Sequence, residues 1–233
     1  DYLYKMNVPE VYLGDTSLII ATYNEEESLS FVLEEIQNYN LGEIIIVDGN
    51  STDKTEQIAN KFNTKFFTQS KKGWGNAVRE AIDEASCEYI VYMDGDGSYN
   101  PNAILEMKSL IGQYDIVFSS RYKGGTKSPD DTPIRALGNM IFTFLVKLLF
   151  KCEITDALFF YPLSKKSVLK NLELSSQDFT LCLELPALAH SQNLKYTEIL
   201  SEERERYAGV TKVNALTDGI KILKGMISLW IRI

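Results

Sequence analysis

The chain has few of the residues that build zinc sites or disulfide frameworks. It contains 3 cysteines and 1 histidine among 233 residues, and Cys87, Cys152 and Cys182 lie far apart. Zinc sites need paired spacings such as Cys-x-x-Cys, and disulfide frameworks occur in short secreted chains dense in cysteine. We therefore expect free thiols in a reducing compartment. We expect His190 to be a surface residue or a satisfied core residue rather than a ligand.

Long apolar runs are also absent. No uninterrupted run reaches the roughly 20 residues that cross a bilayer as a helix, and the first residues have no secretory-signal pattern. The chain starts at Asp1 and stops within an apolar stretch at 227–233. We expect the natural chain to continue beyond this stretch.

Basic residues are too few for a nucleic-acid-binding protein. The net charge is −8, and residues 1–120 carry 8 Lys and Arg against 20 Asp and Glu. This acidic part argues against nucleic acid as a partner. Residues 121–233 carry 16 Lys and Arg against 12 Asp and Glu. Such a basic part suits phosphate or anionic lipid headgroups, although ordinary scatter of charge over a solvated surface remains the alternative.

Short apolar segments alternate with helical patterns along the first half of the chain. Five segments have the character of buried strands: 17–22, 43–48, 65–68, 89–93 and 115–119. Four segments between them repeat apolar residues at helical spacing: 26–37, 53–62, 75–85 and 102–111. This alternation predicts an α/β fold with a mostly parallel sheet flanked by helices. With 45% hydrophobic residues, the chain is large enough for one substantial core or two small ones.

Two apolar stretches follow a loop at 123–133 that is rich in Gly, Pro, Asp and Lys and that we interpret as a mobile lid. Residues 136–150 are almost wholly apolar, with Lys147 intruding, which indicates a core helix or an interfacial one. Residues 217–233 are amphipathic and either lie on a membrane surface or pack onto the domain. Their apolar stripe comprises Leu216, Ile220, Leu223, Ile227 and Trp230.

Two carboxylates end the apolar segment that starts at Tyr89. Asp94 and Asp96 are separated by one residue in a Gly-containing turn, and Asp48 ends another predicted strand. Ligands of open α/β sheets bind at the carboxyl ends of the strands. Paired carboxylates there suit Mg²⁺ or Mn²⁺, which share their remaining positions with water and substrate phosphates. The pattern indicates metal-assisted chemistry on a diphosphate, and an ordinary polar turn is the alternative.

Further motifs accompany this acidic pair between Ser17 and Lys212. They are 21–25 (Ala-Thr-Tyr-Asn-Glu), 47–53 (Val-Asp-Gly-Asn-Ser-Thr-Asp), 72–77 (Lys-Gly-Trp-Gly-Asn-Ala), 94–98 (Asp-Gly-Asp-Gly-Ser), 120–122 (Ser-Arg-Tyr), Arg135, Asp156 and 206–212 (Arg-Tyr-Ala-Gly-Val-Thr-Lys). In this order and spacing the chain resembles the family 2 glycosyltransferases. Within that family it is similar to the dolichyl-phosphate mannose synthases and related polyprenyl-phosphate glycosyltransferases.

The resemblance implies a nucleotide-sugar-binding fold of the GT-A type over residues 1–215, with 216–233 as a juxtamembrane helix. It implies a divalent metal, Mg²⁺ or Mn²⁺, held by Asp94, Asp96 and Ser98, with Asp96 as the principal ligand and catalytic residue. The nucleotide diphosphate would be bound by residues from several strand ends and one loop: Ala21, Tyr23, Glu25, Asp48, Asp94, Arg206 and Lys212.

The resemblance also implies an acceptor that is a phosphate on a long prenyl chain. Arg121 and Arg135 are the candidates to bind this phosphate, because arginine suits bidentate phosphate recognition. Asp156 is the candidate base, with a loop-anchoring carboxylate as the equal alternative. Transfer would invert the anomeric centre, and the protein would be membrane-associated at the cytoplasmic face.

Several positions depart from the family pattern. Ala21 stands where proline is usual, and Gly49 and Asn50 replace the usual acidic residue and glycine. Phe160 stands where the turn after Asp156 usually has glycine. The contacts to the base and to the acceptor are therefore less defined than the metal site.

The sequence leaves the substrates and two other functions open. GDP-mannose is the first expectation for the donor and UDP-glucose the next. A soluble family 2 enzyme acting on a polysaccharide or protein is one alternative, and a non-catalytic nucleotide-sugar-binding module is another. The intact Asp94 and Asp96 argue against the second. A dinucleotide-dependent dehydrogenase is a poor candidate because no Gly-rich loop follows the first strand.

Overall fold

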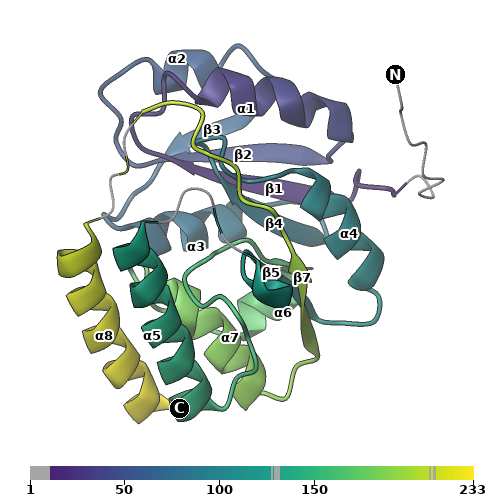
Figure 1. The fold of residues 1–233 in the computed structure, drawn as a ribbon. Helices are drawn as coiled ribbons and strands as arrows, with labels where there is room; N and C mark the ends of the chain where they lie inside the picture. The colour runs from purple at the N-terminus through teal and green to yellow at the C-terminus, as the bar shows by residue number, and fades with distance from the viewer. Residues whose placement is uncertain (1–10, 127, 129–131, 210, 212–213) are drawn as a thin grey trace.

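The computed structural model describes residues 11–126, 128, 132–209, 211 and 214–233. Within this part of the chain, seven strands form one sheet in the order β3-β2-β1-β4-β6-β5-β7 (Figure 1). The strands are β1 Thr16–Thr22, β2 Glu43–Asp48, β3 Lys65–Thr68, β4 Tyr89–Asp94, β5 Ile116–Ser120, β6 Leu163–Lys165 and β7 Tyr196–Leu200.

The sheet is mostly parallel, as the sequence predicts. The pairs β1–β2, β1–β4, β2–β3 and β5–β7 run parallel. Strand β6 is antiparallel to both β4 and β5 and separates them. With three residues it is too short to carry a periodic pattern, so the sequence analysis did not detect it.

Helices cover both faces of the sheet. They are α1 Leu29–Ile36, α2 Thr55–Ala59, α3 Trp74–Glu84, α4 Asn102–Leu110, α5 Pro133–Phe150, α6 Lys166–Asn171, α7 Leu181–Ser191 and α8 Ala215–Arg232, with short 3-10 turns at Gln37–Tyr39 and Lys123–Gly125. Helices α1, α2 and α4 share one core with one face of the strands. Helices α3, α5, α6, α7 and α8 share the other core. This three-layer arrangement follows from strands that are apolar on both faces.

The predicted helix at 53–62 is wrong in its extent. The structure has only Thr55–Ala59 as α2, and the chain turns before Phe62. The N-cap residue of α2 is Lys54, whose side chain makes no capping hydrogen bond, and the Oδ1 of the preceding Asp53 accepts a hydrogen bond of 3.0 Å from the backbone N–H of Thr55. The predicted lid at 123–133 lies partly outside the described residues, and α5 begins at Pro133, three residues earlier than expected.

Helix α5 buries the polar Asn139 and Thr143 together with the apolar Val146 and Phe150, and it keeps further apolar side chains outward. Asn139 and Thr143 are buried, the first donating to Asp156 at 2.8 Å and the second accepting from the N–H of Ala157 at 3.0 Å. The residues of its outward face are 48–71% exposed: Ile134, Leu137, Met140, Ile141, Phe144 and Leu148. The helix therefore has apolar residues both on its buried side and on its outward side. The interfacial alternative for this helix stays a prediction.

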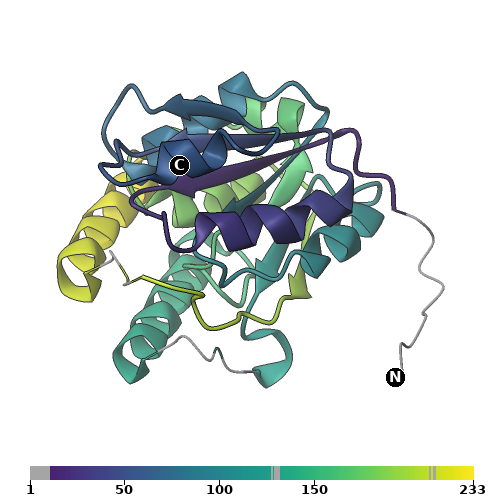
Figure 2. The same cartoon turned by 90° about the horizontal axis from the view of Figure 1, so that it is seen from above.

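Among the described helices, α5 is also the one that is long and apolar enough to cross a membrane by length and composition, and 22% of it is buried. Helices α5 and α8 contact each other and lie side by side (Figures 1 and 2).

Helix α8 is apolar on two faces. Ile222, Met226 and Leu229 are buried against the domain. The Nη2 of Arg232 lies 2.5 Å from the buried Glu184 of α7. The stripe identified from the sequence, which starts at Leu216 and ends at Trp230, is instead 42–77% exposed. The helix therefore packs on the domain with one face and keeps a second apolar face outward.

Candidate active site at the carboxyl edge of the sheet

The register of three strands brings two predicted acids to one edge. Ala21 of β1 pairs with Asp94 of β4, and Thr22 pairs with Asp48 of β2. The two carboxylates therefore stand on either side of the end of β1. This is the edge at which open parallel sheets bind ligands.

Asp48 organises the turn that follows β2. Its carboxylate accepts hydrogen bonds from the hydroxyl of Thr22 at 3.1 Å, the hydroxyl of Ser51 at 2.5 Å and the N–H of Ser51 at 2.7 Å. The backbone of Gly49 approaches β1 closely, its N–H donating to the carbonyl of Thr22 at 2.8 Å. Asp48 thus has a structural task, and its predicted contact with a nucleotide stays a prediction.

Glu25 is connected to the turn that carries the acidic pair. The hydroxyl of Ser28 lies 2.8 Å from the Oε2 of Glu25 and 3.0 Å from the carbonyl oxygen of Gly95. The N–H of Glu25 donates to Thr55 at 2.9 Å, which joins the loop after β1 to α2. Tyr23, in the same loop, is 49% exposed.

Asp94 and Asp96 form a crowded acidic pair. The Oδ1 of Asp96 accepts hydrogen bonds from the N–H of Ser98 at 2.9 Å and from its hydroxyl at 2.7 Å. Burial, together with the charge of Asp96, raises the pKa of the Asp94 carboxyl to about 7. A cation beside such a carboxyl favours its ionised form.

The oxygen atoms of Asp94, Asp96 and Ser98 therefore fit Mg²⁺ or Mn²⁺. In the described part of the chain, no group of three or more His, Cys, Asp or Glu residues forms a complete metal cage. Phosphate oxygens and water would have to supply the other ligands, which is the usual arrangement for Mg²⁺.

The segment after β7 lies along the acidic turn. The N–H of Arg204 donates to the carbonyl of Ser98 at 2.8 Å, and the N–H of Tyr207 donates to the carbonyl of Asp96 at 3.0 Å. These two backbone contacts place Arg206 beside the acidic pair. Its Nη2 lies 2.9 Å from the Oδ2 of Asp96.

Side chains of this segment contact α1, and the segment packs closely on the acidic turn. The guanidinium of Arg204 makes two hydrogen bonds of 2.9 Å to the carboxylate of Glu35. The ring of Tyr207 stacks on Phe31 with centroids 4.2 Å apart. Gly97 adopts a φ of 84°, and a Cβ there would come within 2.9 Å of the Cβ of Tyr207. Glycine is therefore required where the acidic turn meets the segment.

Arg121 and Asp156 are paired with each other. The Nε and Nη2 of Arg121 donate to the two oxygens of Asp156 at 2.7 and 2.9 Å, and its backbone N–H donates at 3.1 Å. Asn139 adds a fourth hydrogen bond to the same carboxylate, which is buried. This geometry favours the loop-anchoring interpretation of Asp156 over a free base. The Nη1 of Arg121 also lies 3.3 Å from Glu203, a residue that the sequence analysis did not single out.

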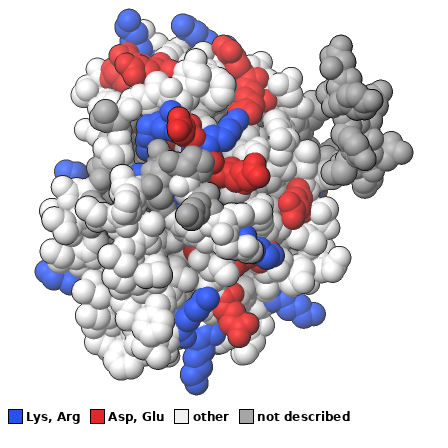
Figure 3. Space-filling model, in the orientation of Figure 1, with Lys and Arg blue, Asp and Glu red and all other residues white. Residues whose placement is uncertain are grey.

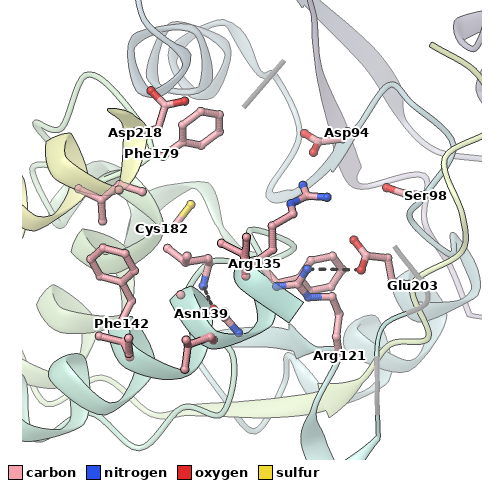
Figure 4. Close-up of a pocket in the computed structure, with 18 of the residues that line it drawn as sticks. Asp94, Ser98, Arg121, Arg135, Asn139, Phe142, Phe179, Cys182, Glu203 and Asp218 are labelled. Atoms are coloured by element: carbon pink, nitrogen blue, oxygen red, sulfur yellow. Dashed lines mark hydrogen bonds and ion pairs between the residues drawn. The ribbon is translucent and has the colours of Figure 1, made fainter. Parts of the chain in front are cut away.

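One cavity of about 410 Å³ joins most of these groups (Figure 4). Its charged end is formed by Asp94, Asp96, Arg121, Arg135, Glu203 and Arg206. Its other end is mostly apolar and is formed by residues of α5 and α8 together with Phe179, with Asp218 beside Phe179 (Figure 4): Ile134, Leu137, Ile141, Phe142, Leu216 and Ile222. Figure 4 shows Arg135, from the first turn of α5, directed into this space. The arrangement can hold a molecule that is anionic at one end and apolar at the other.

The structure does not bring every predicted residue into the cavity. Ser98 lines it. The other predicted residues are not among those that line it: Ala21, Tyr23, Glu25, Asp48 and Asp156. Lys212 lies outside the described residues.

Sequence analysis included Trp74 in the 72–77 motif but assigned no role to Trp74 or to Tyr92. The hydroxyl of Tyr92 bonds to Asp94, and the indole of Trp74 bonds to Tyr92. For Tyr92, the sequence feature that could have indicated a role is a hydroxyl-bearing aromatic residue inside a strand that is mostly apolar.

The chain matches the family described as Glycosyl transferase family 2 over residues 17–173, and it belongs to this family. The protein is therefore a glycosyltransferase, which confirms the class inferred from the acidic pair and its accompanying motifs.

Curated relatives agree with this class. The chain is 28% identical to a dolichyl-phosphate hexose transferase of Haloferax volcanii over 224 residues, covering 94% of this chain and 96% of the relative. It is 30% identical to a dolichol-phosphate mannosyltransferase of Pyrococcus furiosus over 180 residues, covering 72% of this chain and 51% of the relative. It is 25% identical to the glycosyltransferase AglJ of Haloferax volcanii, covering 87% of this chain and 67% of the relative.

Solved structures confirm the predicted GT-A type of fold. Glucosyl-3-phosphoglycerate synthase from Mycobacterium tuberculosis, crystallised with Mn²⁺, uridine diphosphate and phosphoglyceric acid, superposes with a TM-score of 0.70 at 16% identity. The match covers 92% of this chain and 78% of that structure. A further mycobacterial protein superposes with a TM-score of 0.75 at 14% identity, over 94% of this chain and 78% of its own.

Proposed function

We propose that the protein transfers a hexose from a nucleotide-diphosphate sugar to a polyprenyl phosphate of the dolichyl type. One observation carries this proposal: a single cavity joins an acidic pair and arginines at one end to apolar residues of α5 and α8 at the other. The names of the Haloferax and Pyrococcus relatives support a dolichyl-phosphate acceptor. The proposed donor is GDP-mannose, with UDP-glucose as the second choice.

Asp94, Asp96 and Ser98 would hold Mg²⁺ or Mn²⁺ at the donor end. A divalent cation bound there supplies Lewis-acid stabilisation of the departing nucleoside diphosphate. Arg206 has the reach to bind the diphosphate, because its guanidinium already lies 2.9 Å from Asp96. The Mycobacterium synthase, crystallised with Mn²⁺ and uridine diphosphate, supports this division of the site.

Arg121 and Arg135 are the proposed ligands of the acceptor phosphate, and both line the cavity. Arg121 is already shared between Asp156 and Glu203, so an incoming phosphate competes with two carboxylates for it. Arg135 belongs to the first turn of α5, where backbone N–H groups and the helix dipole also favour an anion. A phosphate monoester is already anionic near neutral pH, so its attack needs no strong base. The full engagement of Asp156 is compatible with this chemistry, and single displacement would invert the anomeric centre.

The outward faces of α5 and α8 fit a lipid surface. Figure 3 shows that the surface over these two helices is almost free of charged side chains and that Lys and Arg lie at its margins. Amphipathic helices with this distribution bind at the membrane interface. Peripheral binding there would bring the prenyl chain to the apolar end of the cavity. We propose the cytoplasmic face, which also suits the free Cys87, Cys152 and Cys182.

One assay tests the whole proposal. The protein is incubated with Mn²⁺, dolichyl phosphate and radiolabelled GDP-mannose or UDP-glucose, and lipids are extracted into organic solvent. Label in the organic phase that depends on both metal and dolichyl phosphate supports the proposal. Label that appears only on added polysaccharide or protein contradicts the lipid acceptor. Donor binding without any transfer contradicts catalysis and leaves a binding module.

A further inference from the structure

Tyr92 lies beneath the acidic pair. It is two residues before Asp94 on β4, so both side chains project from the same face of the strand. Tyr92 is only 2% exposed. Its hydroxyl bonds to the Oδ1 of Asp94, and the Nε1 of Trp74 lies 2.8 Å from the same hydroxyl.

The direction of this hydrogen-bond chain follows from its chemistry. The indole N–H of Trp74 is a donor only, and a phenol has one hydrogen to donate. The oxygen of Tyr92 therefore accepts from Trp74, and its single hydrogen is directed to Asp94. A hydroxyl without the indole partner would be able to rotate between donating and accepting orientations.

Aromatic packing holds both rings in place. The rings of Trp74 and Tyr92 meet edge to face with centroids 5.5 Å apart. Phe160 packs edge to face on both rings, at 5.0 and 5.1 Å, and Phe179 stacks on Trp74 at 5.0 Å. Such contacts restrict ring motion in a closely packed interior. The position of the Tyr92 hydroxyl is therefore set by neighbours on several elements.

The fixed hydroxyl of Tyr92 determines how the carboxylate of Asp94 is oriented. With Oδ1 engaged by Tyr92, the other carboxylate oxygen of Asp94 is the one left to act on a ligand, and Asp94 lines the cavity (Figure 4). We propose that Tyr92, directed by Trp74, is a positioning residue that holds Asp94 in the orientation required to bind the metal–nucleotide complex. This inference rests on the proposed function, because that complex is the ligand.

The first experiment examines the hydrogen-bond chain without any ligand. The chain contains 2 tryptophans, Trp74 and Trp230, so ¹⁵N-tryptophan labelling yields two indole N–H signals. Tyr92→Phe keeps the ring and deletes only the hydroxyl. We expect the Trp74 signal to shift upfield in this variant and the Trp230 signal to stay in place. An unmoved Trp74 signal would overturn the proposed chain.

The second experiment measures binding of Mn²⁺ with GDP and of Mn²⁺ with UDP by calorimetry. Loss of one hydrogen bond to a charged group corresponds to a weakening of about tenfold or more, which we expect for Tyr92→Phe. Trp74→Phe should weaken binding less. The double variant should bind no more weakly than Tyr92→Phe alone, because both side chains act through one hydroxyl.

Tyr196→Phe is the matched control. Its hydroxyl, on a half-buried side chain, also makes hydrogen bonds, accepting from the N–H of Glu153 at 3.3 Å and lying 3.0 Å from the Nδ1 of His190, but Tyr196 is at the start of β7, away from the acidic edge. It should leave nucleotide affinity unchanged. Equal affinity of the wild type and Tyr92→Phe would overturn the positioning role alone. A wild type that binds neither nucleotide with Mn²⁺ would overturn the proposed function and this inference with it.

Discussion

Replacing Phe144 and Leu148 by serine tests whether the outward face of α5 contacts lipid. Both residues are 61% exposed, and neither belongs to the buried positions of the helix. Serine at these positions removes apolar surface without opening a cavity in the core. The double variant therefore isolates the surface property from the stability of the fold.

The expected effect follows from the exposed fraction of each residue. Full burial of a Leu or Phe side chain stabilises by about 1.5–3 kcal/mol. With 61% of each residue exposed in the free protein, each contributes about 1–2 kcal/mol on entering the interface. The two together contribute about 2–4 kcal/mol, which corresponds to a loss of membrane affinity of roughly 30- to 1000-fold.

The assay is co-sedimentation with vesicles of phosphatidylcholine and phosphatidylglycerol in equal parts. Tyr12→Ser is the matched control, because Tyr12 is 70% exposed but precedes β1 and belongs to neither α5 nor α8. Point substitutions are preferable to deleting α8, since deletion would also uncover the core residues that pack against Ile222, Met226 and Leu229. Wild-type affinity in the double variant, or an equal loss in Tyr12→Ser, would refute the reasoning.

Three further predictions concern the site and the docking of α8. Asp96→Ala should lower metal-dependent transfer by at least about 100-fold while circular dichroism stays unchanged; full activity would remove the metal hypothesis. Arg135→Ala should raise the KM for dolichyl phosphate by about 10- to 100-fold and the KM for the donor far less; equal effects in steady-state kinetics would count against its assignment. Burial acts to raise the pKa of Glu184, but hydrogen bonds from Arg232 and Ser176 outweigh it and the pKa lies below its ordinary value. The carboxylate therefore contributes stability above its unfolded pKa of about 4.3 and loses it as the pH falls through the folded value. Urea unfolding should show Glu184→Gln less stable by about 1–3 kcal/mol at pH 7, and a constant difference down to pH 3 would contradict this account.

The positions of many strands and helices could be predicted from the periodicity of apolar residues alone. Strands β1 to β5 and helices α1, α3 and α4 lie within a few residues of their predicted positions, because each has a strong apolar pattern and a clear end. The elements in the second half of the chain were harder to predict. Strand β6 has three residues, and α7 is apolar nearly all round, so neither presents a periodic contrast between core and solvent.

The site shows the same division. Asp94 and Asp96 were recognisable because local spacing and a strand end place them together. The contacts of Glu203 with Arg121 and of Trp74 with Tyr92 were not, since they depend on how separate segments pack. Arg121 and Glu203 are 82 positions apart in the sequence, and the parallel pairing of β5 with β7 brings their segments together.

The amino-acid order by itself determined the α/β class, the acidic edge and the two apolar helices, because these properties depend on contacts between residues close along the chain or on strand periodicity. Tertiary structure decided which faces of α5 and α8 are buried, that Asp156 is engaged by Arg121, and that the acidic pair opens into an apolar cavity. The physical reason is that burial and pairing of side chains depend on which surfaces meet. Helices α5 and α8 each have more than one apolar face, so the sequence could not decide which face would be buried.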